Sequence, residues 1–346
     1  MLYFFSEYNV RGNHAGTKAR NDIEKILRKE NAVPINRKIL QLSEKNGSIK
    51  CNIKNRFDFI RYYWDLLFIR NRTVIIQYPM LSFDIDFQYI KKLSRKNRVV
   101  FLIHDIQSLR KMNKNGLEKE IKILNLADAL IVHNCFMTQK IHELGIRQKQ
   151  IYELECFDYL YDKETEAQRD KKAIIYAGNL KKSQFLEEMF RKNEHVEFNL
   201  YGDGWNEVLD EFKNANYQGS FLPDVVIEKL KGKFGLIWDG DSISICSGNY
   251  GEYLKINNPH KVSLYIKCNL PLIIWKEAAL ASFVTNNQIG ICINSLDELD
   301  SILPSISAET YDQMRENIKN INKKISSGYY LTKALTEIEN NMNKQN

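Results

Sequence analysis

Short runs of apolar, β-branched and aromatic residues alternate with stretches of helical periodicity along the chain. In the first half, the apolar runs predict strands at 2–6, 73–78, 98–104, 129–133 and 151–156. The periodic stretches between them predict helices at about 14–30, 57–70, 85–96, 116–126 and 136–144. Because these strands are apolar on both sides, they favour a parallel sheet that is covered by helices on both faces.

The same alternation begins again after a polar segment at 161–172, which we predict to be a linker. Strands are predicted at 173–177, 196–201, 234–238, 270–275 and 289–293. Helices are predicted at about 182–191, 223–231, 259–268, 277–285, 295–303, 308–325 and 330–344. The fold class is therefore α/β, with two Rossmann-like, doubly wound parallel-sheet domains facing a cleft that receives the ligand. Dehydrogenases, periplasmic-type binding proteins and nucleotide-sugar transferases share this outline, so the fold alone does not choose among them.

Composition narrows the class of protein. With 346 residues, 44% of them hydrophobic and 27% charged, the chain is typical of a soluble globular protein of about two domains. No apolar run approaches the ~20 residues that span a bilayer, and the N-terminus has neither the basic region nor the cleavage site of a signal peptide. The cysteines are scattered without a CxxC pair, which argues against disulfides or a zinc site and predicts a cytoplasmic location.

Charge is divided unevenly along the chain. The net charge is +7, but residues 1–150 carry +14 and residues 151–346 carry −7. A basic half attracts nucleic acid, an anionic membrane or a lipid diphosphate, although a solvated lysine-rich surface would give the same count. No basic helix is interleaved with stacking aromatics, so nucleic acid is not expected. The densest basic stretch contains no acidic residue and consists of Lys91, Lys92, Arg95, Lys96 and Arg98.

A glycine-containing turn follows the first predicted strand and leads into a helix that begins near Gly16 and Thr17. A helix N-terminus favours an anion, and glycine lets the backbone approach it. The turn lacks the GxGxxG spacing of a dinucleotide-binding loop, which disfavours a dehydrogenase. An ordinary strand-to-helix turn is the alternative.

Two segments of the second half have the residue types of a phosphate site. After the strand at 173–177, Gly178 and Asn179 precede Lys181 and Lys182, where asparagine can cap a helix and lysine can reach a phosphate. Further on, the segment 256–261 predicts a helix start with Asn258 as N-cap, Pro259 at the first helical position and Lys261 in the first turn. A cation in that turn opposes the helix dipole unless an anion lies beside it, and a chance surface lysine is the alternative.

Two further motifs carry ionisable groups at strand ends. Asp239-Gly240-Asp241 follows a predicted strand and resembles a DxD metal–diphosphate motif, although aspartate and glycine are also ordinary turn residues. His104-Asp105 closes the apolar strand at 98–104 and would face the cleft. Either side chain could deprotonate a hydroxyl, and a polar pair bonded to loop backbone is the alternative.

These residues lie within stretches that resemble a known enzyme family. The block FGLIWDGDSISICSGNYGEYLKINNPHKVSLYIKCNLPLIIWKEAALASFVTNNQIG (234–290) closely resembles bacterial β-1,6-galactofuranosyltransferases of O-antigen and capsule synthesis. The matches HAGTKAR (14–20), FLIHDI (101–106) and IIYAGNL (174–180) extend the resemblance into both predicted domains. More distantly, the chain is similar to the glucosyltransferases that extend the glycan of streptococcal serine-rich adhesins. Both groups have the two-Rossmann GT-B architecture and use a UDP-sugar, so the resemblance implies both properties here.

The resemblance also implies where the donor binds. The C-terminal domain would hold UDP, with Lys261 and either Lys182 or Lys181 at the diphosphate. Thr17 would reach the diphosphate from the other domain. The remaining members of the implied donor site are Gly16, Gly178, Asn179, Phe221, Asp239, Asp241, Asn258, His260 and Glu277.

Some of these implied roles have alternatives. Phe221 matches a tyrosine beside the nucleotide but lacks its hydroxyl group. Glu277 matches a carboxylate that holds the ribose hydroxyls in many GT-B enzymes, and a helix-start carboxylate is the alternative. Asp239 and Asp241 are shared with the galactofuranosyl group only, so they would concern the sugar rather than a metal. No metal and no cofactor are expected, because GT-B enzymes usually work without a metal.

We therefore expect an inverting hexosyltransferase that moves galactofuranose from UDP-galactofuranose to a sugar hydroxyl of a lipid-linked polysaccharide precursor, with His104 or Asp105 as the base. The alternatives are a glucosyltransferase that extends the glycan of a surface adhesin, and a non-catalytic nucleotide- or sugar-binding module. The expected partners are a UDP-sugar, a lipid-diphosphate-linked glycan or glycoprotein, and the inner face of an anionic membrane. The expected domains are residues 1–160 for the acceptor, 161–308 for the donor, and 309–346 as helices that pack back toward the N-terminal domain. The oligomeric state, including a homo-oligomer, stays open.

Overall fold

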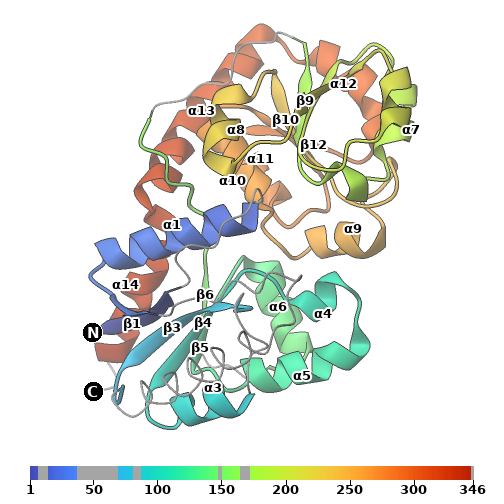
Figure 1. The fold of residues 1–346 in the computed structure, drawn as a ribbon. Helices are drawn as coiled ribbons and strands as arrows, with labels where there is room; N and C mark the ends of the chain where they lie inside the picture. Colours follow the sequence, from blue (N-terminus) through green and yellow to red (C-terminus); the bar gives the residue numbers. More distant parts are fainter. Residues whose placement is uncertain (7–14, 37–68, 81–86, 147–149, 164–171, 344–346) are drawn as a thin grey trace, which may run out of the picture.

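The computed structural model describes residues 1–6, 15–36, 69–80, 87–146, 150–163 and 172–343. Its first sheet has six parallel strands in the order β2-β1-β3-β4-β5-β6 (Figure 1). The strands are β1 (Leu2–Ser6), β2 (Val33–Asn36), β3 (Thr73–Tyr78), β4 (Arg98–Ile103), β5 (Ala129–Val132) and β6 (Gln150–Glu153). The helices of this half are α1 (Ala15–Lys29), α3 (Phe87–Ser94), α4 (Gln107–Arg110), α5 (Lys114–Leu124) and α6 (Cys135–Glu143). We call this half the N-terminal lobe.

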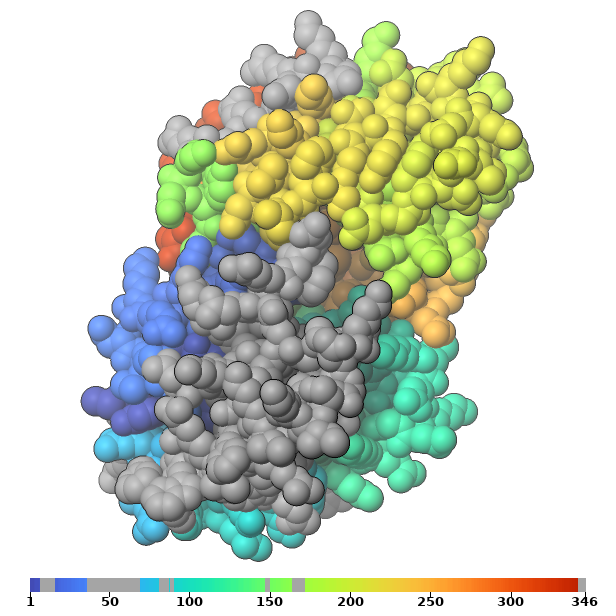
Figure 2. Space-filling view, in the orientation of Figure 1, coloured from blue at the N-terminus to red at the C-terminus, as the bar shows by residue number. Residues whose placement is uncertain are grey.

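The second sheet repeats the parallel arrangement in the order β12-β11-β10-β7-β8-β9. Its strands are β7 (Ile174–Ala177), β8 (Phe198–Tyr201), β9 (Ala215–Gly219), β10 (Phe234–Ile237), β11 (Leu272–Trp275) and β12 (Gly290–Ile293). Its helices are α7 (Leu186–Lys192), α8 (Pro223–Lys229), α9 (Gly248–Leu254), α10 (His260–Lys267), α11 (Ala281–Asn286), α12 (Leu299–Ser305) and α13 (Ala308–Ser327). We call this half the C-terminal lobe. Figure 2 shows its yellow and green surface above the teal surface of the N-terminal lobe.

The strand order reverses at one point in each sheet. In the C-terminal lobe the chain runs from β7 outward through β8 and β9, and then returns to the other side of β7 to form β10. The carboxyl ends of β7 and β10 therefore flank the position where open α/β sheets bind ligands. Residues 178–183 follow β7 and residues 238–247 follow β10, so the fold brings the predicted phosphate-type loop and the Asp239-Gly240-Asp241 motif together.

The last two helices divide between the lobes. Helix α13 buries Met314, Ile318, Ile321 and Ile325 in the core of the C-terminal lobe. Helix α14 (Tyr329–Asn343) instead packs into the core of the N-terminal lobe, against α1 and β6 (Figure 1). The buried carboxylate of Asp158 accepts hydrogen bonds from the first backbone amides of α14. The chain thus crosses between the lobes a second time near its end.

The apolar runs predicted most of the strands, and the misses have physical reasons. Strand β2 is four residues long and contains Pro34, and β9 is a half-exposed edge strand without apolar alternation. Helix α9, with the sequence GNYGEYL, was not predicted because its two glycines disfavour a helix. The helices predicted to begin at 182 and 277 begin at Leu186 and Ala281. Most of the helix predicted at 57–70 and most of the linker predicted at 161–172 lie outside the described residues.

Candidate active site

His104 lies directly after β4 and is held in one orientation. Its Nε2 atom is 2.8 Å from Oε1 of Gln77, whose own amide nitrogen donates to the Arg20 carbonyl at 3.4 Å. That second bond orients the Gln77 amide so that its oxygen faces the histidine, which makes His104 Nε2 the donor. The Nδ1 atom therefore carries the lone pair and is the atom that can accept a proton.

The surroundings of His104 keep its ring neutral. Burial, reinforced by the charge of Arg20, lowers the pKa of His104 well below its ordinary value of 6.5. The ring is parallel to that of Phe157, with 6.0 Å between the centroids. A neutral, oriented imidazole at the end of a sheet is an arrangement suited to a general base.

Asp105 has a different environment although it is the next residue. Its carboxylate forms an ion pair with Arg110 at 2.8 Å. Burial raises the pKa of Asp105, while Arg110 and the Tyr253 hydroxyl act in the opposite direction. Tyr253 belongs to α9 of the C-terminal lobe, and its oxygen accepts the backbone N–H of Ile106. Asp105 thus takes part in the contact between the lobes, and its carboxylate is already engaged.

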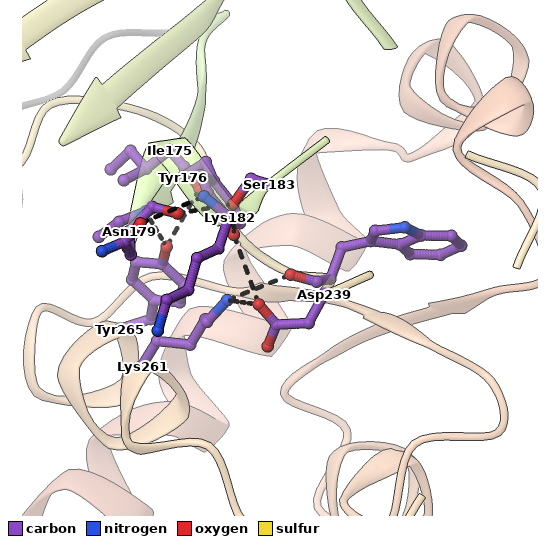
Figure 3. Close-up of polar contacts among 10 residues, drawn as sticks. Ile175, Tyr176, Asn179, Lys182, Ser183, Asp239, Lys261 and Tyr265 are labelled. Atoms are coloured by element: carbon purple, nitrogen blue, oxygen red, sulfur yellow. Dashed lines mark hydrogen bonds and ion pairs between the residues drawn. The ribbon is translucent and has the colours of Figure 1, made fainter. Parts of the chain in front are cut away.

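In the C-terminal lobe, Lys261 is bound by residues from both strand ends at the reversal point (Figure 3). Its ammonium donates to Oδ1 of Asp239 and to the Trp238 carbonyl, both at 3.1 Å. The same nitrogen lies 4.6 Å from the ring centroid of Tyr176, which is on β7. The Tyr176 hydroxyl is 2.6 Å from Ser183 Oγ and donates to Asp239 Oδ1 at 3.5 Å. Sequence reasoning predicted Lys261 and Asp239 separately, and the structure joins them.

The turn after β7 presents a second lysine. Asn179 Oδ1 accepts the backbone N–H of Lys182 at 3.2 Å, so the prediction that Asn179 caps the next helical turn is confirmed. The backbone of Gly202 packs closely against Gly178. Gly202 has φ +131°, and a Cβ on it would lie 1.8 Å from the carbonyl oxygen of Gly178. The Lys182 side chain is exposed, and its ammonium lies 5.0 Å from the Tyr250 ring centroid. Lys181 is exposed beside it.

The prediction that Asn258 caps α10 is wrong. The N-cap position is Pro259, and the Asn258 side chain is used between the lobes. Its amide nitrogen donates to the carbonyls of His133 (2.8 Å) and Glu155 (3.1 Å), and its oxygen accepts from Asn134 at 2.6 Å. Its backbone N–H donates to His133 Nδ1 at 2.9 Å. Asn258 therefore anchors the start of α10 to the N-terminal lobe instead of closing the helix end.

The first turn of α10 meets helix α1 of the other lobe. His260 lies beside the rings of Phe157 and Tyr159, at centroid distances of 5.9 and 5.1 Å. Its Nε2 atom is buried without a hydrogen-bond partner among the described residues, and burial, with the charge of Lys18, lowers its pKa to about 3. Thr17 is buried on α1, which packs against α10, and Gly16 beside it is exposed.

Among the described residues, three that were predicted for the donor site lie at neighbouring strand ends and form no hydrogen bond or ion pair with Lys261, Asp239 or Tyr176. Phe221 is half-buried after β9, and Asp241 is exposed next to Gly248. Glu277 is exposed after β11 and pairs with Lys255 at 3.4 Å. Their roles at the nucleotide stay predictions.

Some residues that shape the site were not predicted. Gln77 orients His104, and it could have been found as the one side-chain amide inside the apolar run TVIIQY. Tyr250 lies near Lys182 of its own lobe and also 5.6 Å from the Arg110 guanidinium of the other. His133, which the sequence motifs did not single out, connects the lobes through Asn258. Such contacts depend on how two lobes meet, and no local pattern encodes that.

Two facing, doubly wound parallel sheets with polar strand ends between them are the architecture of GT-B glycosyltransferases, although other two-domain α/β proteins share the outline. Known structures agree on the fold. The sucrose-phosphate synthase of Thermosynechococcus elongatus superposes with a TM-score of 0.63 at 10% identity, covering 99% of this chain and 98% of that one. Anabaena Alr3699/HepE, solved in complex with UDP-glucose, superposes with a TM-score of 0.52 at 10% identity and covers 99% of both chains.

Sequence comparison identifies the family. The models of the N-terminal and C-terminal domains of Glucosyltransferase 3-like proteins match residues 2–156 and 174–338. The chain is 34% identical to the β-1,6-galactofuranosyltransferase WbbI of Escherichia coli K12, over 97% of this chain and 98% of that one. It is 22% identical to Glucosyltransferase 3 of Streptococcus gordonii, over 95% and 96% of the two chains. The chain belongs to the Glucosyltransferase 3-like family and is a hexosyltransferase.

Proposed function

We propose that this protein transfers galactofuranose from UDP-galactofuranose to a sugar hydroxyl of a lipid-diphosphate-linked glycan, with inversion at the transferred carbon. The observation that carries the proposal is the placement of Lys261 and Lys182 at the reversal point of the C-terminal sheet, opposite a neutral histidine of the N-terminal lobe. The likeness to the galactofuranosyltransferase WbbI supports the choice of sugar.

The chemistry divides between the lobes. His104 Nδ1 takes the proton from the acceptor hydroxyl, whose oxygen forms the new bond to the anomeric carbon. The bond from that carbon to the diphosphate breaks, and UDP leaves with the electron pair. Lys182, Lys261 and the positive end of the α10 helix dipole stabilise the negative charge that develops on UDP. Inversion requires a single base opposite the leaving group.

A panel of UDP-sugars with a lipid-diphosphate-linked sugar acceptor tests the donor. We expect UDP release with UDP-galactofuranose, and a purified variant with Lys182 and Lys261 both replaced by methionine is the inactive control. Turnover with UDP-glucose alone would favour the second candidate, a glucosyltransferase acting on a glycosylated protein, which the likeness to Glucosyltransferase 3 supports. Binding of UDP without transfer from any donor would favour a non-catalytic binding module.

We also propose that transfer needs no metal. The described residues contain no group of three or more histidine, cysteine, aspartate or glutamate side chains arranged to hold an ion. Within the Asp239-Gly240-Asp241 motif, the Asp239 carboxylate already has Lys261 as its cation. Activity should therefore survive EDTA, and loss of activity that manganese restores would contradict this part of the proposal.

The lipid-linked acceptor would bring the protein to a membrane surface from the cytoplasmic side. No helix in the described ranges combines the length and apolarity that crossing a bilayer requires. Lys92, Arg95 and Lys96 are exposed on and just after α3, whereas Lys91 and Arg98 are half-buried. Each exposed cation near an anionic surface contributes about 1 kcal/mol, and salt screens it. We expect binding to anionic vesicles at low salt and release at high salt; equal binding to neutral vesicles would contradict it.

A further inference from the structure

The ammonium of Lys261 is nearly withdrawn from solvent, with 13% of its side chain exposed. Two of its three hydrogens have oxygen acceptors, in the Asp239 carboxylate and the Trp238 carbonyl. The Tyr176 ring lies 4.6 Å from the same nitrogen. An ammonium on a flexible four-carbon chain is fixed in place only by such contacts. The Tyr176 hydroxyl also interacts with the ammonium, so Asp239, Trp238 and Tyr176 together fix the position of the charge.

The loop that carries Asp239 is itself closely packed. Gly240 has φ +113°, and a Cβ there would lie 2.2 Å from the Ser247 carbonyl oxygen. Only glycine fits that conformation and that approach. The turn residue of the Asp-Gly-Asp motif thus sets the position of the carboxylate in front of it. Asp239 Oδ1 accepts from Lys261 on α10 and from Tyr176 on β7, so one oxygen atom joins three elements.

We propose that Asp239 is a positioning residue for donor binding, whose carboxylate holds the Lys261 ammonium charged and in the place where it attracts the diphosphate. This inference rests on the proposed function, because it takes the donor to be a nucleoside diphosphate sugar. In this proposal Asp239 acts through Lys261. It binds neither a metal ion nor a hydroxyl group of the sugar. Its expected effect is therefore on binding of UDP itself.

The electrostatics of the cluster agree with that geometry. The ionisable groups near the Lys261 ammonium include Asp239 after β10, Tyr176 on β7, Tyr265 on its own helix and the Cys246 thiol. Burial pulls the pKa of Lys261 down, but Asp239 and the two tyrosines outweigh burial and hold the pKa above its ordinary value of 10.5. Without the carboxylate, burial would lower the pKa of Lys261, and the buried ammonium would lose its proton at a lower pH.

The test is UDP affinity, measured by calorimetry between about pH 7 and pH 10. The proteins are the wild type, Asp239→Asn, Lys261→Met and the double variant. Glu187→Gln is the matched control, because it removes a carboxylate from an exposed ion pair with Arg191 in the same lobe. We expect Asp239→Asn to weaken UDP binding about ten-fold and to shift the alkaline loss of affinity to lower pH. In the Lys261→Met background, Asp239→Asn should change the affinity by less than about two-fold.

Each other outcome has a defined meaning. Unchanged affinity in Asp239→Asn, or an equal further loss in the Lys261→Met background, would overturn the inference. A rise in the Michaelis constant for the UDP-sugar without a change in UDP affinity would also overturn it, since that result indicates contact with the sugar. Absence of UDP binding by the wild type would instead contradict the proposed function. If Asp239→Asn does not fold, Tyr176→Phe replaces it in the test, because this variant keeps the ring and removes the hydrogen bond to Asp239. It should also lose UDP affinity at a lower pH than the wild type.

Discussion

His104 after β4 and Lys261 on α10 are both largely withdrawn from solvent, but the two lobes favour opposite charge states. In the N-terminal lobe, burial lowers the pKa of His104 and favours the neutral ring. In the C-terminal lobe, burial also acts on Lys261, but Asp239 and two tyrosines outweigh it and keep the ammonium charged. One lobe thus provides a neutral proton acceptor and the other provides a fixed cation. A transfer reaction that moves a proton at one side of the sugar and releases a diphosphate at the other requires that difference.

The largest effect should come from removing the proton acceptor. His104→Ala should lower kcat by about 10²- to 10⁴-fold, because general-base catalysis contributes on that order. Affinity for UDP should stay close to that of the wild type, since the cations lie in the other lobe. Steady-state kinetics and calorimetry measure the two quantities, with the exposed His142→Ala as a control. Similar losses in both histidine variants would remove the distinction between the lobes.

The next effect should separate the two neighbouring lysines after β7. Lys182→Met should weaken UDP binding by about 10- to 100-fold, because a charge-assisted contact to phosphate is lost. Lys181→Met should have a smaller effect, since Lys182, and not Lys181, lies beside Tyr250 at the junction of the lobes. Calorimetry with UDP measures both variants. A larger loss in Lys181→Met would assign the diphosphate contact to the other lysine.

The stability of the protein should depend on Asn258, which anchors the start of α10 to the N-terminal lobe. Asn258→Ala removes three side-chain hydrogen bonds, to the carbonyls of His133 and Glu155 and from the amide of Asn134, and two of the three are buried. The loss should cost about 1–3 kcal/mol of the free energy of unfolding. Asn257→Ala should cost less, because the Asn257 side-chain oxygen has no partner among the described residues. Urea unfolding measures the free energy of unfolding of both variants. Equal stability of the two variants would show that the anchor contributes little.

The smallest effect concerns pH. The base must be neutral to accept a proton, and the pKa of His104 lies well below 6.5. Activity should therefore be kept as the pH falls through 6.5 and be lost only at clearly lower pH. The pH dependence of kcat/KM for the donor shows the pH at which activity is lost on the acidic side. A limb centred near 6.5 would indicate an exposed histidine or a different base.

The sequence predicted the parts of this comparison that depend on local pattern. Apolar runs located both sheets, and the residues that follow their carboxyl ends include His104, Asn179 and Asp239, while a helix-start pattern located Lys261. It did not predict the use of Asn258, because a helix-start pattern looks the same whether the asparagine closes the helix or reaches another lobe. It also missed Gln77 and Tyr250, whose roles arise from neighbours far away in the sequence. Contacts within one strand end can be predicted from the sequence, and contacts across the joint require the fold.

The most direct test of the central claim is acceptor-dependent release of UDP from UDP-galactofuranose, with the configuration of the new glycosidic bond determined by proton NMR. The account predicts UDP release only when a lipid-diphosphate-linked sugar is present, one new bond for each UDP, and inverted configuration at the transferred carbon. Retention of configuration would contradict the single-base mechanism at His104. UDP binding without acceptor-dependent release from any UDP-hexose would contradict hexosyl transfer by this protein.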